Sequence, residues 1–300
     1  MSENASPGGG PPRVAAVLTA DARIAQTLDT LARLFACEPP PSEVLVHVDG
    51  NQVACADAVR QAFPAVRVLV SAQRVGPGGG RNALLAAATA PIVASFDDDS
   101  YPIDRDYFAR VRDVIQRFPD ASVVCAGVYH QGEAVAEASR QASWVADFVG
   151  CGCIYRAAAF ARGTGYVPLA VAYGMEESDL ALRLHARGER VLFTPWLRVF
   201  HDTDRARHAD PAVTAASISN LALLTFLRYP IALWPVGFMQ SVNRVSWLLR
   251  NGRQRGVLRG LASIPQRLWT YRAYRGPVSR RQLKSYLNLR RQPVAAEFQS

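Results

Sequence analysis

Three consecutive aspartates, Asp97, Asp98 and Asp99, follow a short apolar run of the sequence. Like charges this close together repel one another, and a divalent cation removes that cost. Hard cations such as Mg²⁺ or Mn²⁺ prefer carboxylate oxygens and often bridge to phosphate groups. The triplet therefore predicts a site for a metal and a diphosphate. The alternative is a solvated loop whose last aspartate caps a helix.

A second acidic group, Glu176, Glu177 and Asp179, stands at the start of a segment with leucines at helical spacing. The helix dipole favours a carboxylate at this end, and a carboxylate that faces a cleft can act as a general base. An acidic first turn without a catalytic role is the alternative. Further along the chain, His201 becomes a candidate metal ligand if it is a partner of the aspartate triplet.

The elements that would position these residues alternate regularly in the first hundred residues. Short apolar runs predict strands at 14–18, 44–48, 66–70 and 92–96. Helical spacing predicts helices at 22–35, 53–63 and 81–90, and the glycine-rich string at 76–80 predicts a loop. This alternation predicts a parallel sheet with helices on both faces, which binds its ligands beyond the carboxyl ends of the strands.

The pattern is looser beyond residue 100. It predicts helices at 107–118 and 178–187, and strands at 123–128 and 190–193, the last stopped by Pro195. From residue 211 onward it predicts only helices. We therefore expect a disordered tail at 1–12, a catalytic domain at 13–210 and a basic amphipathic helical extension at 211–300.

The net charge of +9 is distributed unevenly. Residues 1–204 hold 18 Arg and 23 acidic residues, a net charge of −5, whereas residues 205–300 hold 15 Arg, one Lys and two acidic residues, a net charge of +14. This asymmetry predicts two parts with different partners. Because Lys284 is the only lysine, a P-loop and a protein kinase are excluded.

The five cysteines, Cys37, Cys55, Cys125, Cys151 and Cys153, contain no CxxC pair, which favours reduced thiols and a cytosolic setting. Cys151 and Cys153 are expected to be small residues that line the acceptor side. The first residues lack the features of a signal peptide, and no run of eighteen apolar residues predicts a transmembrane helix.

Taken in order, six motifs resemble an inverting family-2 glycosyltransferase of the rhamnosyl- or galactosyltransferase type. They lie at 17–19, 48–51, 80–83, 96–99, 150–156 and 176–184, and are followed by Pro195 and His201. The resemblance covers roughly residues 13–204. It implies an α/β fold of the GT-A type: a Rossmann-like mixed sheet flanked by helices, with a C-terminal helical extension.

The resemblance implies roles at the donor end of the site. Thr19 and Asp49 match positions that hold the nucleobase, although Val48 replaces the first aspartate of the family's usual Asp-Asp-Gly-Ser. Arg81 matches an arginine that faces the base or the diphosphate. Asp98 matches the contact to the ribose.

The resemblance also implies the metal ligands and the base. Asp97 and Asp99 match the outer members of the Asp-x-Asp motif, with Asp99 as the first candidate ligand of Mn²⁺ or Mg²⁺, and His201 matches a further ligand. Glu177 stands where the family usually has a catalytic aspartate. Glu176 and Asp179 remain alternatives for that base.

The implied activity is transfer of one sugar from a UDP- or dTDP-sugar to a glycan or lipid-linked acceptor, in cell-envelope or exopolysaccharide assembly. The Gln-x-x-Arg-Trp motif of processive synthases is absent, which favours single transfer. The alternatives are a non-catalytic scaffold or glycan-binding protein with the same fold and, with less support, a sugar nucleotidyltransferase.

The segment 211–300 combines apolar and aromatic residues with many arginines. This composition predicts peripheral contact with an anionic membrane, and hence a cytoplasmic protein on the inner face of the cytoplasmic membrane. A helical subdomain packed on the catalytic core is the alternative, and a nucleic-acid partner is not expected. Arginine in place of nearly every lysine hints at a GC-rich bacterial genome.

Overall fold

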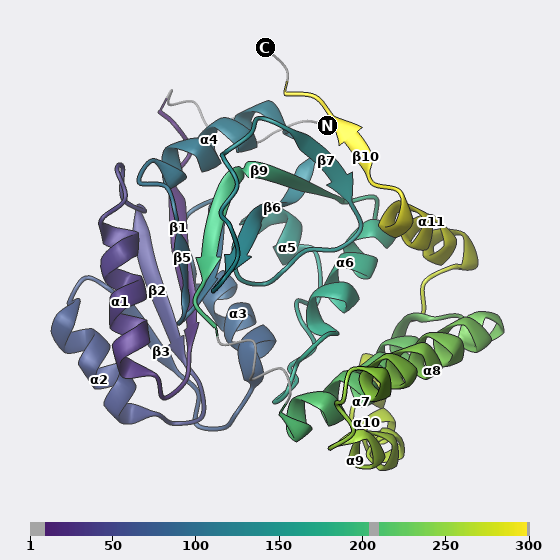
Figure 1. Ribbon diagram of the computed structural model, residues 1–300. Coiled ribbons are helices and arrows are strands. Elements are labelled where there is room, and N and C mark those ends of the chain that lie inside the picture. The colour runs from purple at the N-terminus through teal and green to yellow at the C-terminus, as the bar shows by residue number, and fades with distance from the viewer. Residues whose placement is uncertain (1–9, 204–209, 299–300) are drawn as a thin grey trace.

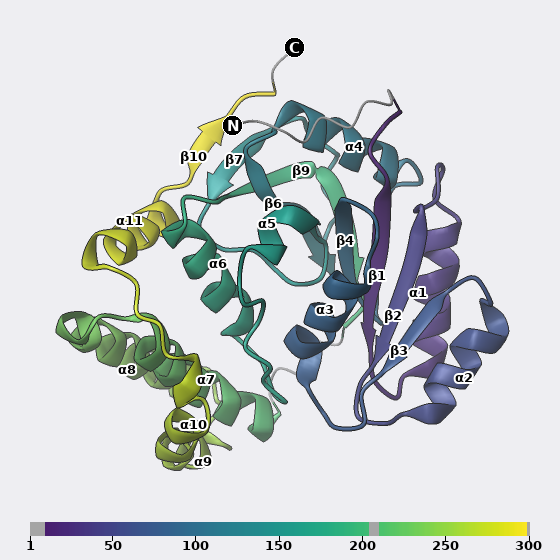
Figure 2. The same cartoon turned by 180° about the vertical axis from the view of Figure 1, so that it is seen from behind.

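The computed structural model describes residues 10–203 and 210–298, so most of the expected N-terminal tail lies outside the described residues. A ten-stranded mixed sheet has helices on both faces (Figures 1 and 2). The strands are β1 (Val14–Ala20), β2 (Glu43–Val48), β3 (Arg67–Val70), β4 (Ile92–Asp97), β5 (Ser100–Pro102), β6 (Ala121–His130), β7 (Ala142–Val145), β8 (Cys153–Arg156), β9 (Arg190–His201) and β10 (Val294–Ala296). The α-helices are α1 (Ile24–Phe35), α2 (Val53–Ala62), α3 (Gly76–Ala87), α4 (Tyr107–Arg117), α5 (Ala157–Ala161), α6 (Glu176–Ala186), α7 (Pro211–Arg228), α8 (Trp234–Arg250), α9 (Val257–Ala262), α10 (Ile264–Thr270) and α11 (Arg280–Arg291).

The strand order is β10-β7-β9-β6-β8-β4-β1-β2-β3, with β5 paired to β9. The half formed by β4, β1, β2 and β3 is parallel, as the alternation of the sequence predicts. Antiparallel β8 lies between β4 and β6 and joins this half to the rest of the sheet. The mixed α/β fold expected from the sequence is confirmed.

Strand β1 is the centre of the parallel half, and all seven of its residues are buried. Val14, Ala16 and Leu18 pack into the core on the side of α1 and α4, whereas Ala15 and Val17 pack with residues of α3 and α6 on the other side. A strand that is covered on both faces needs a continuous apolar run, and β1 has one.

The glycine-rich string at 76–80 is not a loop, as the sequence had suggested, but the first turns of α3. A Cβ on Gly80 would lie 2.6 Å from His47 Nδ1, and one on Gly78 would lie 2.6 Å from Glu176 Oε2. The glycines therefore let this helix approach β2 and α6 more closely than any other residue type would allow. Close packing outweighs their low helix propensity.

Strand β9 does not stop at Pro195 but continues to His201. Beside β6 its register jumps, because Ala126 pairs with Thr194 whereas Gly127 pairs with Arg198. The segment 195–197 is thus left out of the ladder as a bulge, where a proline, which lacks an N–H group, is tolerated. The continuation matters because it carries His201 to the cleft.

The segment after residue 210 is also not purely helical. Its strand β10 pairs antiparallel with β7 and extends the catalytic sheet, so the C-terminal segment returns to the body of the protein (Figure 1). Arg290 of α11 forms an ion pair with Asp147, 2.9 Å away. The helices α7 to α10 form a separate layer beside α6 (Figure 2). No helix of the described ranges is long and apolar enough to cross a membrane.

Candidate functional site

A polar cleft of about 270 Å³ opens where β1, β2 and β4 end. Six of the residues singled out from the sequence line it: Thr19, Asp49, Asp97, Asp98, Asp99 and His201. The carboxyl ends of parallel strands meet at one edge of a sheet, which brings these side chains together. Two further cleft residues, Arg23 and Arg74, were not predicted.

Asp97, the last residue of β4, is held from two sides. Its Oδ1 accepts hydrogen bonds from Thr19 Oγ1 at 2.8 Å and from an Arg81 guanidinium nitrogen at 2.5 Å. About a quarter of the side chain remains exposed to the cleft. Asp97 is therefore fixed in direction and still accessible to a ligand.

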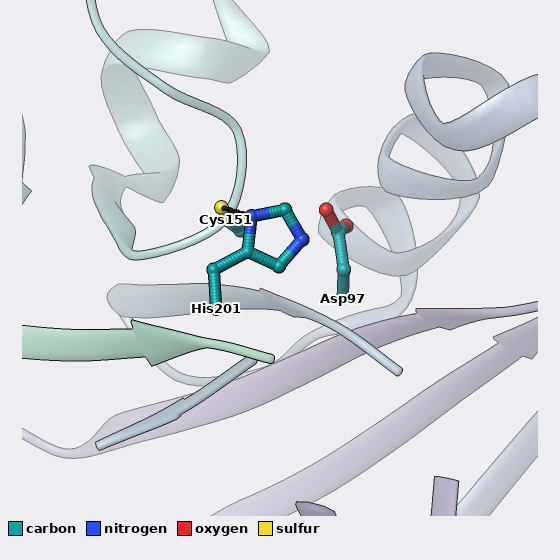
Figure 3. A group of neighbouring side chains, drawn as sticks. All are labelled: Asp97, Cys151 and His201. Carbon is teal, nitrogen blue, oxygen red and sulfur yellow. Dashed lines mark hydrogen bonds between the residues drawn. The ribbon is translucent and has the colours of Figure 1, made fainter. Parts of the chain in front are cut away.

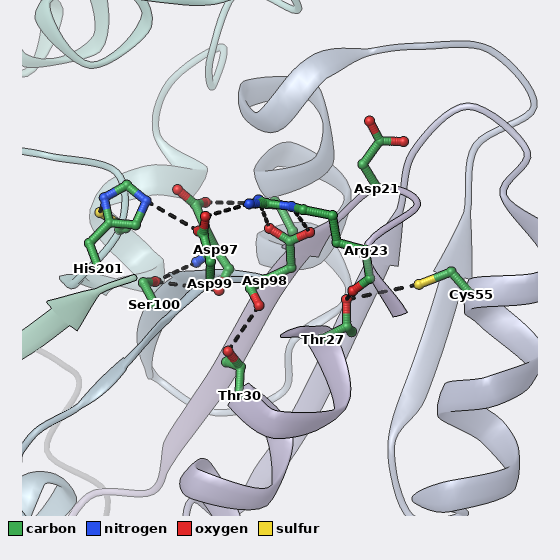
Figure 4. Close-up of polar contacts among 12 residues, drawn as sticks. Asp21, Arg23, Thr27, Thr30, Cys55, Asp97, Asp98, Asp99, Ser100 and His201 are labelled. Carbon is green, nitrogen blue, oxygen red and sulfur yellow. Dashed lines mark hydrogen bonds and ion pairs between the residues drawn. The ribbon is translucent and has the colours of Figure 1, made fainter. Parts of the chain in front are cut away.

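Asp98 and Asp99 share one cation, the guanidinium of Arg23 (Figure 4). The Arg23 Nε donates to Asp98 Oδ2 at 3.0 Å, and Arg23 NH1 donates to Asp99 Oδ2 at 2.5 Å. Both carboxylates are only 3% exposed. The repulsion expected within the triplet is thus relieved by an arginine of the chain itself, three residues beyond the end of β1. That position beside a strand end was the only signal that could have indicated it.

The two carboxyls of this pair differ in acidity. Burial raises the pKa of Asp98 to about 6, and Arg23 opposes that shift only in part. Burial also acts to raise the pKa of Asp99, but His201 and Arg23 together outweigh it and lower that pKa to about 2. Asp99 therefore stays ionised to a lower pH than Asp98.

His201 reaches the same point from the end of β9. Its Nε2 lies 3.1 Å from Asp99 Oδ1, and its Nδ1 lies 3.5 Å from Cys151 Sγ. Burial acts to lower the pKa of His201, but the neighbouring aspartates outweigh it and raise that pKa. One ligand atom each from Asp97, Cys151 and His201 lie within 4.8 Å of one another (Figure 3).

These residues fit a divalent cation. Asp99 Oδ1 is buried and has no hydrogen-bond partner among the described residues, since its contact with His201 is close but lacks hydrogen-bond geometry. A buried carboxylate oxygen left in this state is costly unless something satisfies it. Carboxylate oxygens and an imidazole nitrogen are suitable ligands for Mn²⁺.

Asp49, at the end of β2, has a structural task beside its place in the cleft. Its carboxylate accepts from the backbone N–H groups of Val75 at 2.9 Å and Gly76 at 3.0 Å, and from Ser71 Oγ at 2.9 Å. It therefore caps the N-terminus of α3 from a neighbouring strand. This cap holds the wall of the cleft that Gly76 forms.

Arg81 does not line the cleft but lies beneath it, 1% exposed. Its guanidinium binds Glu176 Oε1 at 3.0 Å and Asp97 at 2.5 Å, while its Nε donates to Ser95 Oγ at 3.2 Å. Burial raises the pKa of Glu176 to about 8 even with this partner. Arg81 and Glu176 thus form a buried link between β4 and α6.

The three acids at the start of α6 have different surroundings. Asp179 is fully buried and binds Arg183 at 2.8 Å and Arg228 at 2.5 Å. It therefore joins α6 to α7 and lies away from the cleft. Glu177 is half-buried and accepts a hydrogen bond from the backbone N–H of Gly150 at 3.2 Å. Within the described ranges, no arginine lies within ion-pair distance of Glu177.

The side chains of Glu177 and Arg81 both lie close to Gly150. A Cβ on this glycine would lie 2.6 Å from Glu177 Oε1 and 2.7 Å from Arg81 Cζ. Gly150 directly precedes Cys151, the neighbour of His201. The residue whose N–H binds the Glu177 carboxylate is thus the neighbour in sequence of Cys151, one of the group formed by Asp97, Cys151 and His201. Burial raises the pKa of Glu177 more than the nearby Arg81 lowers it, and a raised pKa strengthens the carboxylate as a base.

Comparisons with known proteins agree with the fold. The family model described as glycosyl transferase family 2 matches residues 17–163. No curated protein sequence matches the chain. Among solved structures, the mannosyltransferase PcManGT from Pyrobaculum calidifontis, in complex with GDP-Man and Mn²⁺, is 17% identical and has a TM-score of 0.57, over 95% of this chain and 88% of that one.

Two other solved structures are similar at the level of the fold. GalNAc-T7 with UDP, GalNAc and Mn²⁺ is 11% identical, with a TM-score of 0.59 over 75% of this chain and 49% of that chain. TarS from S. aureus with UDP-GlcNAc is 14% identical, with a TM-score of 0.56 over 77% and 72% of the two chains. All three support the GT-A architecture.

Substitution of Arg23 tests its role as the internal counter-charge. We expect Arg23→Ala to lower the free energy of unfolding by about 3 kcal/mol in EDTA-containing buffer, because two buried carboxylates lose their partner. The measurement is urea denaturation. The control is Arg74→Ala, which removes an exposed ion pair with Asp21 in the same cleft and should change stability by less than about 1 kcal/mol. A loss for Arg23→Ala no larger than that of the control would contradict the assignment.

Proposed function

Because the chain is a family 2 glycosyltransferase, we propose that it transfers one sugar from a UDP- or dTDP-sugar to a hydroxyl of a glycan or lipid-linked acceptor. The transfer inverts the anomeric carbon and requires a divalent cation. The observation that carries this proposal is the position of Glu177, a carboxylate without an arginine partner among the described residues, beside the group of Asp97, Cys151 and His201.

The proposed binding of the sugar donor is supported by the cleft. Thr19, Asp49 and Asp97 stand at the ends of three adjacent parallel strands, where an α/β sheet binds its ligand. The solved structures of similar fold hold nucleotides or nucleotide sugars, two of them with Mn²⁺. In this chain, Asp97 and His201 would hold the cation, and Asp99, 3.1 Å from His201 Nε2, would stand beside them. When bound, the cation would neutralise the charge that develops on the departing diphosphate.

The chemical step rests on Glu177. A hydroxyl is a poor nucleophile until a base accepts its proton, and the raised pKa of Glu177 favours that acceptance. The Gly150 N–H group holds the carboxylate in place, and Arg81 keeps the neighbouring Asp97 at a fixed position. A single displacement on the face opposite the leaving diphosphate gives inversion. Glu176 and Asp179 serve as positioning residues, because arginines already occupy their carboxylates.

A second proposal concerns the surface of α8 to α10, which we propose lies on an anionic membrane. An apolar groove of about 630 Å³ runs between α7, α8 and α10 and contains Phe226, Phe238 and Leu268. Phe238 in the groove and Trp269 on α10 are each 68% exposed. The basic C-terminal segment carries arginines on the same helices, so charge and apolar surface both match an anionic lipid headgroup layer. Such a location suits a lipid-linked acceptor and places the enzyme on the inner face of the cytoplasmic membrane.

Nucleotide binding tests the donor site. We expect UDP or dTDP, but not CMP, to raise the thermal midpoint of the full chain, and to do so only with Mn²⁺ present. A ligand at about 100 times its dissociation constant stabilises the native state by about 2.7 kcal/mol. A thermal-shift panel of UDP, dTDP, GDP and CMP, each with and without Mn²⁺, makes the measurement. No shift with any nucleotide would contradict the proposed function.

Substitution of Glu177 tests the base. We expect Glu177→Gln to retain donor affinity and thermal midpoint and to lower turnover by about 10²- to 10⁴-fold, the usual contribution of a general base. The comparison variant is Glu176→Gln, which should lower stability because Arg81 loses a buried partner. Turnover near the wild-type level in Glu177→Gln would exclude Glu177 as the base.

Flotation with liposomes tests the membrane surface. We expect the full chain to float with vesicles that contain phosphatidylglycerol and to stay in the pellet fraction with pure phosphatidylcholine. Phe238→Asp should reduce the bound fraction about tenfold, because burial of one such side chain contributes about 1.5–3 kcal/mol. Val53→Asp, an exposed apolar position on α2, is the control and should bind normally. Failure of the wild type to float would contradict this proposal.

A further inference from the structure

Cys151 lies beside His201, a residue of the cleft, although the sequence had suggested only a small residue on the acceptor side. Its side chain is 2% exposed, and its Sγ lies 3.5 Å from His201 Nδ1. Neither the donor cleft nor the base proposed above uses this thiol. A buried thiol, an imidazole and a carboxylate that lie together form a set of ligands that transition metals bind.

The local backbone explains why Cys151 faces the site while Cys153 does not. In an extended strand, residues two apart would point to the same face. Gly152 between them has φ +83°, a left-handed conformation that favours glycine, and its N–H donates to Ser95 O at 2.7 Å. Cys153 Sγ instead donates to Gly150 O at 3.1 Å and lies in the core, fully buried. The turn thus places the Cys151 thiol beside His201 and the Cys153 thiol in the core.

Three segments far apart in the sequence bring the candidate metal ligands together (Figure 3). Asp97 comes from β4, Cys151 from the turn before β8 and His201 from the end of β9, and one ligand atom of each lies within 4.8 Å of the others. Ligands about 2.0–2.3 Å from one tetrahedral ion are about 3.3–3.8 Å apart, so small side-chain shifts would complete the site. Partial exposure of Asp97 and His201 leaves a path from the cleft.

A second observation points to the same site. Asp99 Oδ1 is buried without a hydrogen-bond partner among the described residues, and it lies 3.1 Å from His201 Nε2. An imidazole that binds a metal through one nitrogen usually donates its other N–H to a carboxylate, which orients the ring. With Nδ1 beside Cys151 and Nε2 beside Asp99, His201 has both neighbours that such an arrangement needs.

We propose that Cys151 Sγ is a protein ligand of the divalent cation, together with Asp97 and His201, and that Asp99 orients the histidine. This inference rests on the proposed function and specifies the cation. A thiolate is a soft ligand that Mg²⁺ does not favour, whereas Co²⁺ and Zn²⁺ accept mixed sulfur, nitrogen and oxygen ligands. The site therefore selects a transition metal over Mg²⁺. Binding replaces the S–H bond with a metal–sulfur bond and releases the proton to solvent.

Co²⁺ is the probe, because a thiolate bound to it gives a charge-transfer band in the near ultraviolet that oxygen and nitrogen ligands do not give. Metal-free full-length protein is titrated with CoCl₂ and followed by absorption. We expect the band in the wild type and in the matched control Cys153→Ser. We expect its loss in Cys151→Ser and Cys151→Ala, with cobalt affinity about 10- to 100-fold weaker. A 100-fold excess of Mg²⁺ should leave the band unchanged, whereas Zn²⁺ should remove it.

The outcomes separate this inference from the proposed function. Binding of Co²⁺ without the band, or an equal band in Cys151→Ser, would overturn the cysteine ligand, and the nucleotide panel could still succeed. The band together with no nucleotide binding would support the ligand and overturn the transferase proposal. Circular dichroism and thermal midpoints of the four proteins verify that each is folded.

Discussion

The buried guanidinium of Arg81 is the interaction on which the rest of the site depends. It binds Asp97 at the end of β4 and Glu176 at the start of α6, two carboxylates that would be costly in the interior without a cation. Arg81 can reach both because the glycines of α3 let that helix pack closely against β2 and α6. Its side chain therefore fixes the position of the end of β4 relative to the start of α6.

The acidic residues of the site differ in their arginine partners. Arg23 pairs with both Asp98 and Asp99, and Arg228 pairs with Asp179. Asp97 keeps an exposed edge, and Glu177 keeps a carboxylate without an arginine partner among the described residues. Asp97 and Glu177 are thus the two acids whose carboxylates are most open to a further partner.

The segment 169–173 lies between the cleft and helix α7. Leu169 packs its carbonyl against Gly76, and Ala170 lines the cleft. A few residues further on, Asn220 of α7 donates to the carbonyls of Val171 at 3.0 Å and Tyr173 at 3.1 Å. Helix α7 therefore holds the same segment that forms part of the cleft wall.

The sequence by itself determined the order of strands and helices in the parallel half and the placement of the aspartate triplet at a strand end. Apolar periodicity reports local structure, and the carboxyl ends of parallel strands always meet. It did not predict the pairing of Arg23 with residues 75 and 76 positions away, nor the helical state of the glycine string, nor the continuation of β9 past Pro195. Those features depend on contacts between distant segments, where a missing Cβ or a single guanidinium outweighs local propensity. Only the tertiary structure separated Glu177 from Glu176 and Asp179, and placed Cys151 beside His201, because it decides which charges find a partner.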